Sequence, residues 1–272
     1  MKSSGKYKLL VLTLAILLLP LAKNTSMTLF ASDLFETYMK WDKQNDVKVI
    51  LIDPGHGGKD HGCSGNHLRE KDVALQLAFK VGRLIQENYR EIEIRYTRDK
   101  DIFIPLHQRV KMANQEDVDL FISLHCNAVS SPKAHGIETY VMGVETSQEN
   151  LEIANRENDV ILLEDLETYN PYTEEGHIML AMMQQQTLEK SIQLASYTQN
   201  ELASVTSFRD RGVKQAGFVV LRKVLVPSML IEAGFISNPE DASRLKEQQE
   251  QNKIAHSIVS GVGKYIDFYQ TQ

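Results

Sequence analysis

The sequence predicts an α/β domain whose central sheet is mostly parallel or mixed and carries helices on both faces. Three observations support this fold class. Short apolar, β-branched runs alternate along the chain with segments whose apolar residues recur at helical spacing. A glycine-rich loop, residues 54–62, directly follows the first such run. The 272 residues are 42% hydrophobic and 24% charged, which is typical of a globular protein and compatible with one domain.

The first half of the chain begins with the run VKVILID, which predicts a buried strand that enters the glycine-rich loop. Apolar residues spaced by three and four predict the helices, and Pro105 suits the first turn of one of them. Strands are expected at 47–53, 92–97, 119–125 and 137–142, and helices at 72–89 and 105–114.

The second half resumes with a long helical pattern and returns to short apolar runs. A helix is expected at 178–202, strands at 218–221 and 228–232, and a final helix at 254–268. In an open α/β sheet, ligand-binding groups collect at the carboxyl ends of the strands. Residues that follow the strands are therefore the candidates for chemistry.

The N-terminus resembles a secretory signal, because three lysines precede an uncharged apolar run at 9–22. This run is shorter than the roughly 20 residues of a spanning helix, so a cleaved signal peptide at residues 1–26 is expected, with a permanent anchor as the alternative. Residues 27–45 are expected to be a polar lead-in. The expected location is the periplasm or cell envelope. Removal of residues 1–26 takes away four lysines and no acids, which changes the net charge from −6 to −10. A nucleic-acid partner is therefore not expected.

The segment 144–176 differs from the rest of the predicted catalytic domain, which spans 46–270. Between Glu145 and Glu175 it holds ten acids and one base, a net charge of −9. We interpret it as an acidic insert. The only cysteines are Cys63 and Cys126, which excludes a disulfide framework but leaves separate thiols, one bridge or an extra metal ligand open.

Four ionisable residues stand next to predicted buried strands. His56 follows the first strand, Glu70 precedes the first helix, His125 ends the strand FISLH, and Glu232 ends the apolar run SMLIE. Catalytic zinc is held by a few His and carboxylate ligands with one open position, and a carboxylate after an apolar strand is costly to bury without a role. Each residue alone also fits a structural role: a turn, a helix cap or an ion pair.

Five motifs in the same order resemble the zinc-dependent N-acetylmuramoyl-L-alanine amidases of the bacterial division-amidase type. They are DPGHGGKDHGCSG, REKD, TRDKDIFIPLHQRVKMAN, FISLHCNA and IEAGFISNPED, and the resemblance covers about 47–143 and 178–268. It implies that one zinc ion is held by His56, Glu70 and His125, and that Glu232 is the catalytic general base. The implied reaction hydrolyses the amide between the lactyl group of N-acetylmuramic acid and L-alanine in peptidoglycan, during wall remodelling or daughter-cell separation.

Two arginines in the third motif, Arg98 and Arg109, are expected to orient loops or acidic groups, with contact to a peptide carboxylate as the alternative. The remaining loop histidines, namely His61, His67, His107, His135 and His177, are expected to make surface or local hydrogen bonds.

Some relatives of this type carry a helical insert that presents a carboxylate to the metal, so the resemblance implies that 144–176 is autoinhibitory. The insert is predicted to have a helical face that can pack, formed by Ile153, Val160, Leu163 and Leu166. Glu164 is the predicted blocking residue. A protein activator would then displace the insert. The alternative is a solvated acidic loop.

Two other functions remain open from the sequence. A zinc peptidase that acts on stem peptides would use the same metal chemistry, and a wall-binding regulator would keep the fold without catalysis. The intact set of four ionisable residues favours an enzyme. A monomer is expected.

Overall fold

The computed structural model describes residues 46–143, 147–164 and 174–270, of which 174–186 by backbone alone. Residues Asn45–Gln272 form one compact unit. The predicted signal peptide, the lead-in and part of the acidic insert lie outside the described residues. Among the residues described, no helix is both long and apolar enough to cross a membrane.

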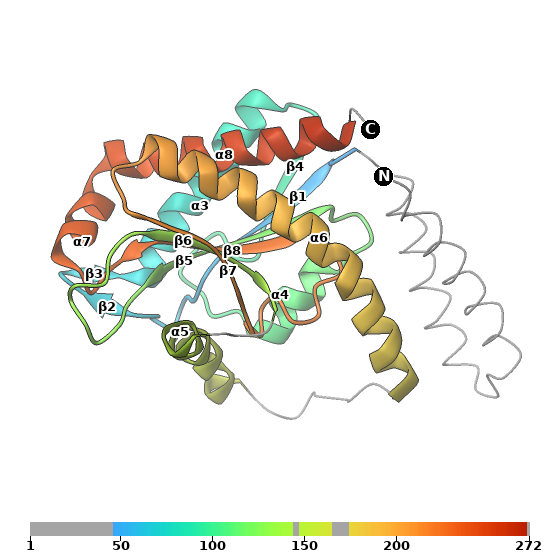
Figure 1. The fold of residues 1–272 in the computed structure, drawn as a ribbon, viewed down its shortest axis with the longest axis horizontal. Helices are drawn as coiled ribbons and strands as arrows, with labels where there is room; N and C mark the ends of the chain where they lie inside the picture. Colours follow the sequence, from blue (N-terminus) through green and yellow to red (C-terminus); the bar gives the residue numbers. More distant parts are fainter. Residues whose placement is uncertain (1–45, 144–146, 165–173, 271–272) are drawn as a thin grey trace, which may run out of the picture. The chain divides into compact units, whose positions relative to one another are not determined.

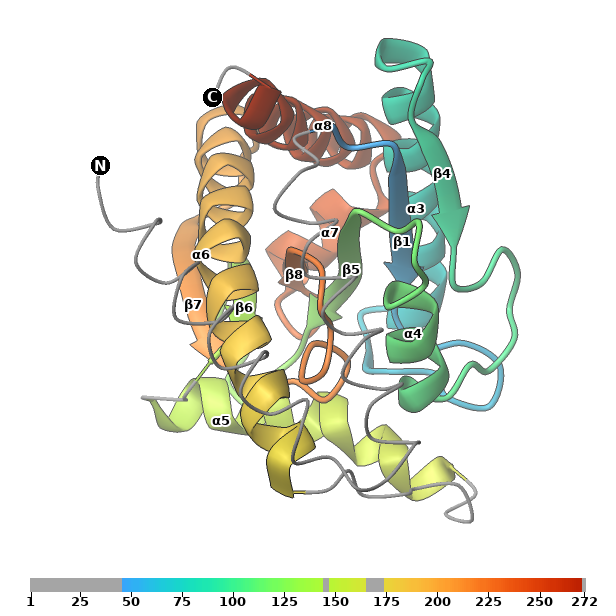
Figure 2. The ribbon, with the colours of Figure 1, turned by 90° about the vertical axis from the view of Figure 1, so that its right-hand side faces the viewer.

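The unit is built on a six-stranded sheet with the order β4-β1-β5-β8-β6-β7 (Figures 1 and 2). Neighbouring strands are parallel except for β6 and β8, which are antiparallel. The mixed sheet that the sequence predicts is therefore confirmed. The strands are β1 (Val49–Pro54), β4 (Glu93–Tyr96), β5 (Leu120–Asn127), β6 (Ile137–Met142), β7 (Asp210–Ala216) and β8 (Ser228–Phe235).

Three long helices pack on one face of the sheet and enclose the main core (Figure 1). They are α3 (Glu70–Asn88), α6 (Glu174–Val205) and α8 (Gln248–Gln270), and the short α7 (Pro239–Lys246) precedes α8. Alternate residues of β5, such as Ile122 and Leu124, point into this core because successive side chains of a strand face opposite sides. The other face of the sheet holds the polar residues of the site beside further buried apolar side chains, such as Phe121 and Leu230.

The opposite face carries α4 (Leu106–Ala113) and, at the strand ends, the insert helix α5 (Gln148–Asn158) with a 3₁₀ turn at Asp159–Leu163. Ser123 and His125 of β5 point to this face. His125 pairs in register with Glu232 of β8, and Glu232 with Glu138 of β6. One cross-strand row of polar residues therefore lies at the rim where β1, β5 and β8 end.

One predicted element differs from the structure, and the structure adds a helix and a hairpin that the sequence did not predict. Residues 218–221 form a turn instead of a strand, and the edge strand is β7. Phe218 in that turn is buried and packs edge-on against Tyr140, with ring centroids 5.0 Å apart. The final helix predicted at 254–268 lies within α8, and the added helix α7, which Asn238 caps through its side chain, precedes it. The loop after β1 also contains a short hairpin, β2 (Ser64–Gly65) with β3 (Leu68–Arg69).

Candidate metal centre

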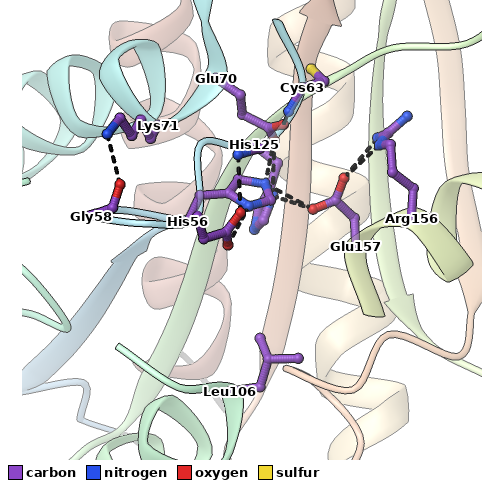
Figure 3. A network of polar contacts seen from close by, with 12 residues as sticks. His56, Gly58, Cys63, Glu70, Lys71, Leu106, His125, Arg156 and Glu157 are labelled. Atoms are coloured by element: carbon purple, nitrogen blue, oxygen red, sulfur yellow. Dashed lines mark hydrogen bonds and ion pairs between the residues drawn. The ribbon is translucent and has the colours of Figure 1, made fainter. Parts of the chain in front are cut away.

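Four side chains converge at the rim of the sheet: His56, Glu70, His125 and Glu157 (Figure 3). Each offers one ligand atom, and these atoms all lie within 4.8 Å of one another. His56 Nε2 is 3.1 Å from Glu70 Oε1 and 3.0 Å from Glu157 Oε2. His125 Nδ1 is 3.1 Å and 3.0 Å from the same two oxygens. The three residues that the sequence predicts as metal ligands are therefore together, with a fourth from the insert.

The geometry of this group suits a divalent metal ion. Ligand atoms at zinc distances of about 2.0–2.2 Å in a tetrahedron lie roughly 3.3–3.6 Å apart, close to the separations observed here. All four residues are buried. Within the described part of the chain, His56 Nε2 and Glu157 Oε2 have no hydrogen-bond partner of acceptable geometry although they face each other. Two imidazoles and two carboxylates whose lone pairs converge are a donor set that could hold zinc.

The electrostatics of the group favour a positive charge at its centre. Burial alone would lower the pKa of His56, but the carboxylates of Glu70 and Glu157 outweigh it and raise the pKa well above its usual value. Against the same burial effect, mainly Glu157 raises the pKa of His125 to about 9. Burial opposes ionisation of Glu157, but chiefly His56 and Arg156 hold its pKa well below its usual range. A bound cation would satisfy the same demand for positive charge.

Two glycines allow the ligand residues to approach this closely. A Cβ atom on Gly55 would lie 2.4 Å from His125 Cε1, inside the imidazole ring's contact distance. A Cβ atom on Gly62 would lie 2.6 Å from Glu70 Oε2, and the φ of this glycine is +62°. Any larger residue at either position would displace a ligand side chain. The glycine-rich loop is therefore required by the packing around the site.

Further contacts orient the ligand side chains. His56 Nδ1 lies 2.8 Å from Asp60 Oδ2, which leaves Nε2 to face the centre. Glu70 Oε2 accepts from the backbone N–H of Cys63 at 2.8 Å, and Oε1 accepts from that of Cys126 at 3.0 Å. Partners of this kind fix the orientation of metal ligands. Asp60 is not among the site residues predicted from the sequence, although its position four residues after His56 in the same loop is a usable signal.

Glu232 lies beside the ligands on the adjacent strand. Its side chain is fully buried, and neither carboxyl oxygen has a hydrogen-bond partner among the described residues. Burial, followed by the neighbouring charges of Glu157 and Glu70, raises the pKa of Glu232 well above its usual value. A buried carboxyl with a raised pKa, next to a metal centre, is suited to accept and return a proton.

The acidic insert supplies both Glu157 and its neighbour Arg156. Arg156 donates to Glu157 Oε1 from Nη2 at 2.7 Å and from Nε at 3.0 Å. It also donates from Nη1 to Asn127 Oδ1 at 3.1 Å and to the carbonyl of Ala128. Its Nη2 lies 3.9 Å from Glu232 Oε1. The insert therefore touches the metal ligands and Glu232 at once, as Figure 3 shows for Glu157 and Arg156.

Glu164, the residue that the sequence predicts as the blocking one, lies elsewhere. Its Oε1 accepts from the backbone N–H of Leu106 at 2.6 Å, and its Oε2 lies 2.8 Å from His107 Nδ1. It thus joins the insert to α4 directly after the 3₁₀ turn, whereas Glu157 lies at the metal ligands. The structure therefore does not bring Glu164 to the metal ligands, and it places Glu157 of the same insert there instead. The local hydrogen bonding expected of His107 is with Glu164.

Both arginines of the third motif are buried and build the floor of the loop. Arg98 donates to the carbonyls of Pro54, Gly55 and Lys71. Arg109 pairs with the buried Asp53 at 2.6 Å and donates to the carbonyl of His56 at 2.6 Å. Their contacts are those of scaffold residues, in line with the structural role expected for them.

The two cysteines are free thiols on either side of Glu70. Cys126 is buried in the core, and the Cys63 thiol donates to the carbonyl of Cys126 at 3.1 Å. Neither belongs to the group of convergent ligand atoms. Burial raises the pKa of both thiols, which keeps them protonated.

The fold and the site define an α/β domain that could hold one metal ion beside a buried carboxyl, as metal-dependent hydrolases do. The chain belongs to the N-acetylmuramoyl-L-alanine amidase family, whose model matches residues 50–264. The family predicted from the sequence motifs is thus confirmed, and with it the class of enzyme.

Named relatives agree with this assignment. The amidase AmiC of Escherichia coli O6:H1 is 35% identical over 222 residues, which are 80% of this chain and 52% of AmiC. AmiA of Escherichia coli K12 is 32% identical over 240 residues, 86% of this chain and 81% of AmiA. The chain thus spans about half the length of AmiC. An amidase structure from Clostridium difficile 630 matches with a TM-score of 0.62 and 28% identity, over 82% of this chain and 98% of that one.

Proposed function

We propose that this chain hydrolyses the amide bond between the lactyl group of N-acetylmuramic acid and the L-alanine of peptidoglycan stem peptides. The observation that carries the proposal is the convergence of His56, Glu70 and His125 beside the buried Glu232. The first three would hold one zinc ion. Membership of the amidase family supports the bond that is cut.

Each of these residues has a separate task. A zinc ion, when bound, lowers the pKa of a water molecule to about 7 and polarises the amide carbonyl. Glu232 accepts the proton of the attacking water and delivers it to the leaving L-alanine nitrogen, because an amine anion is a very poor leaving group. Asp60 keeps His56 in the tautomer that offers Nε2. The buried position of Glu232 keeps its pKa high enough to carry the proton between the two steps.

The insert is proposed to hold the enzyme inactive. Glu157 fills the fourth position around the ligands, where a water or a substrate carbonyl would bind in a catalytic zinc site. Arg156 brings a positive charge to 3.9 Å from Glu232, which opposes its action as a base. A partner that pulls α5 away would free the metal position and Glu232 together. The partner would be a protein activator, and the enzyme itself a monomer.

Export to the periplasm or cell envelope is part of the proposal, because peptidoglycan is found there. The basic and apolar N-terminus supports it. N-terminal sequencing of the protein recovered from the envelope tests it. A start after residue 20 agrees with a cleaved signal, whereas an intact N-terminus contradicts cleavage.

Mass analysis of the products released from purified peptidoglycan tests the function. The full chain with Glu157→Gln, loaded with zinc, is expected to release peptides that begin with a free L-alanine and to leave unmodified lactyl groups on the glycan. The same chain with Glu232→Gln added is expected to release none. Cleavage inside the stem peptide would instead indicate a peptidase. Tight binding without cleavage would indicate a wall-binding regulator.

A further inference from the structure

Two basic residues of the edge strand β7, Arg211 and Lys214, lie on the same side as the metal centre. Both contact the buried carboxylate of Glu138: Arg211 Nε donates to Oε2 at 2.7 Å, and Lys214 Nζ donates to Oε2 at 2.6 Å. The other oxygen of Glu138 accepts from Asn127 at 2.8 Å and from the Tyr140 hydroxyl at 3.1 Å. Each oxygen of Glu138 therefore accepts two hydrogen bonds, and its negative charge balances one of the two positive charges.

The second positive charge is balanced by the insert. Arg211 Nη2 donates to Glu149 Oε1 at 2.5 Å, and Lys214 Nζ donates to Asn150 Oδ1 at 3.1 Å. Glu149 and Asn150 form the first turn of α5. When α5 leaves, its carboxylate and amide oxygens leave with it. Two cations then face one carboxylate, so the cluster keeps one uncompensated positive charge and unused donors.

This basic cluster continues into the metal centre. Asn127 donates to Glu138 at 2.8 Å and accepts from Arg156 at 3.1 Å, and Glu138 pairs in register with Glu232. Helix α5 lies along the whole strip, and Figure 2 shows it running below the ends of β7, β6 and β5. Its acidic residues Glu149 and Glu157 contact the two ends of the strip. Eight residues of helix separate them by about 12 Å.

We propose that Arg211 and Lys214 form a subsite that binds a carboxylate of the substrate's stem peptide, and that Glu149 occupies it while the insert is in place. The proposal rests on the proposed amidase function. A muramoyl residue whose lactyl carboxyl is amidated carries no charge, so the carboxylates of the substrate are on the peptide side of the bond that is cut. The stem peptide therefore runs from the metal centre toward β7. About 12 Å corresponds to roughly three to four residues of extended chain.

The chemistry of the cluster suits this ligand. The Arg211 guanidinium is held by Glu138 through Nε and offers Nη2 outward, and Lys214 contributes a second cation beside it. Arg and Lys together recognise a carboxylate by charge-assisted hydrogen bonds, which are stronger than neutral ones. The insert thus imitates the substrate at two points, with Glu157 at the metal position and Glu149 at the peptide carboxylate.

Binding without turnover tests the subsite directly. The full chain with Glu157→Gln and Glu232→Gln is titrated with two fluorescent N-acetylmuramoyl tripeptides and followed by anisotropy. One probe has free carboxyl groups, and in the other they are carboxamides. Arg211→Gln and Lys214→Gln are each expected to weaken binding of the acidic probe by roughly tenfold to a hundredfold, the loss of one hydrogen bond to a charged group. Binding of the carboxamide probe should stay within about twofold of its starting value.

Two further variants separate recognition from folding. Arg211→Lys keeps the charge and is expected to recover part of the binding. Lys264→Gln removes an exposed lysine whose partner is Glu201 on α6, and it should change neither probe. Thermal melting of every variant shows whether the protein still folds when Glu138 keeps only one of its two cationic partners.

The outcomes distinguish the subsite from the activity. The subsite is overturned if the substitutions weaken binding of both probes equally or weaken binding of neither. It is also overturned if neither probe binds. If the Glu157→Gln chain fails to cut peptidoglycan while carboxylate-dependent binding persists, the proposed function falls and the subsite stands. If it cuts and the acidic probe shows no dependence on Arg211 or Lys214, the function stands and the subsite falls.

Discussion

Replacing Glu157 by Gln should open the enzyme without any partner. The Glu157 carboxylate accepts two hydrogen bonds from Arg156, at 2.7 and 3.0 Å, and lies 3.0 Å from both ligand imidazoles. Loss of one charged hydrogen bond at a buried position costs roughly 1.5–3 kcal/mol. Since about 1.4 kcal/mol corresponds to a factor of ten, the balance between closed and open forms should shift toward the open form by about tenfold to a hundredfold.

The assay measures release of soluble material from dye-labelled peptidoglycan by the zinc-loaded full chain. Glu157→Gln is expected to raise the rate by about tenfold to a hundredfold. The matched control is Glu152→Gln, which removes the same charge from an exposed position of the same helix and should leave the rate unchanged. Equal rates for the wild-type chain and Glu157→Gln, or an equal increase in Glu152→Gln, would refute the role of Glu157 as the lock.

Three further substitutions test the site and its support. Asp60→Asn should weaken zinc binding by about tenfold to a hundredfold in a competitive chelator titration, because His56 loses the carboxylate that orients it; unchanged affinity would exclude that role. Although burial would raise the pKa of Asp53, chiefly Arg109 holds it below its usual value. The stability that Asp53 supplies is therefore present above a pH of about 4 and lost as the pH falls through its lower folded-state pKa. Asp53→Asn should lower the free energy of unfolding at neutral pH by about 3–5 kcal/mol and flatten its acid dependence, both measured in urea titrations. A stability that falls with pH in parallel with that of the wild-type protein would contradict this. Glu164→Ala should raise the basal rate only about twofold to tenfold, because its contacts with Leu106 and His107 are part-buried or exposed and water screens such charged contacts. An effect as large as that of Glu157→Gln would restore Glu164 as the blocking residue.

The central strands were predictable because burial on both faces leaves a direct trace in the sequence. The runs that became β1, β5 and β8 are almost wholly apolar, and their predicted positions agree with the structure within a few residues. The edge strand β7 has no such trace, because DRGVKQA is mostly polar. The apolar run at 218–221 instead forms a turn, in which Phe218 packs against Tyr140 of β6. Periodicity alone does not separate these two cases.

The residues His56, Glu70 and His125 of the candidate metal centre were predictable from their motifs, whereas the insert residue that lies beside them depends on helix phase. In an uninterrupted α-helix, Glu157 and Glu164 lie on the same face as Ile153, at about 40° and 20° from it. The structure breaks this phase, because the α-helix ends at Asn158 and a 3₁₀ turn follows. Glu157 is thus carried inward with Ile153, while Glu164 turns toward α4. No local pattern in the sequence marks where the helix changes type.

The subsite of Arg211 and Lys214 could not be read from the sequence for a related reason. Its three charged members come from β6 and β7, and Glu138 lies 73 residues from Arg211 and 76 residues from Lys214 in the chain. Neither strand has an apolar pattern that predicts their pairing. Only the parallel register of β6 and β7 brings them together.

Anomalous diffraction at the zinc edge from crystals of the full chain tests the central claim most directly, namely that a residue of the insert closes a metal centre. One anomalous peak is expected, bounded by His56 Nε2, His125 Nδ1 and one carboxylate oxygen each of Glu70 and Glu157. A peak bound by the first three residues with Glu157 turned away, or zinc held anywhere else in the chain, would contradict it.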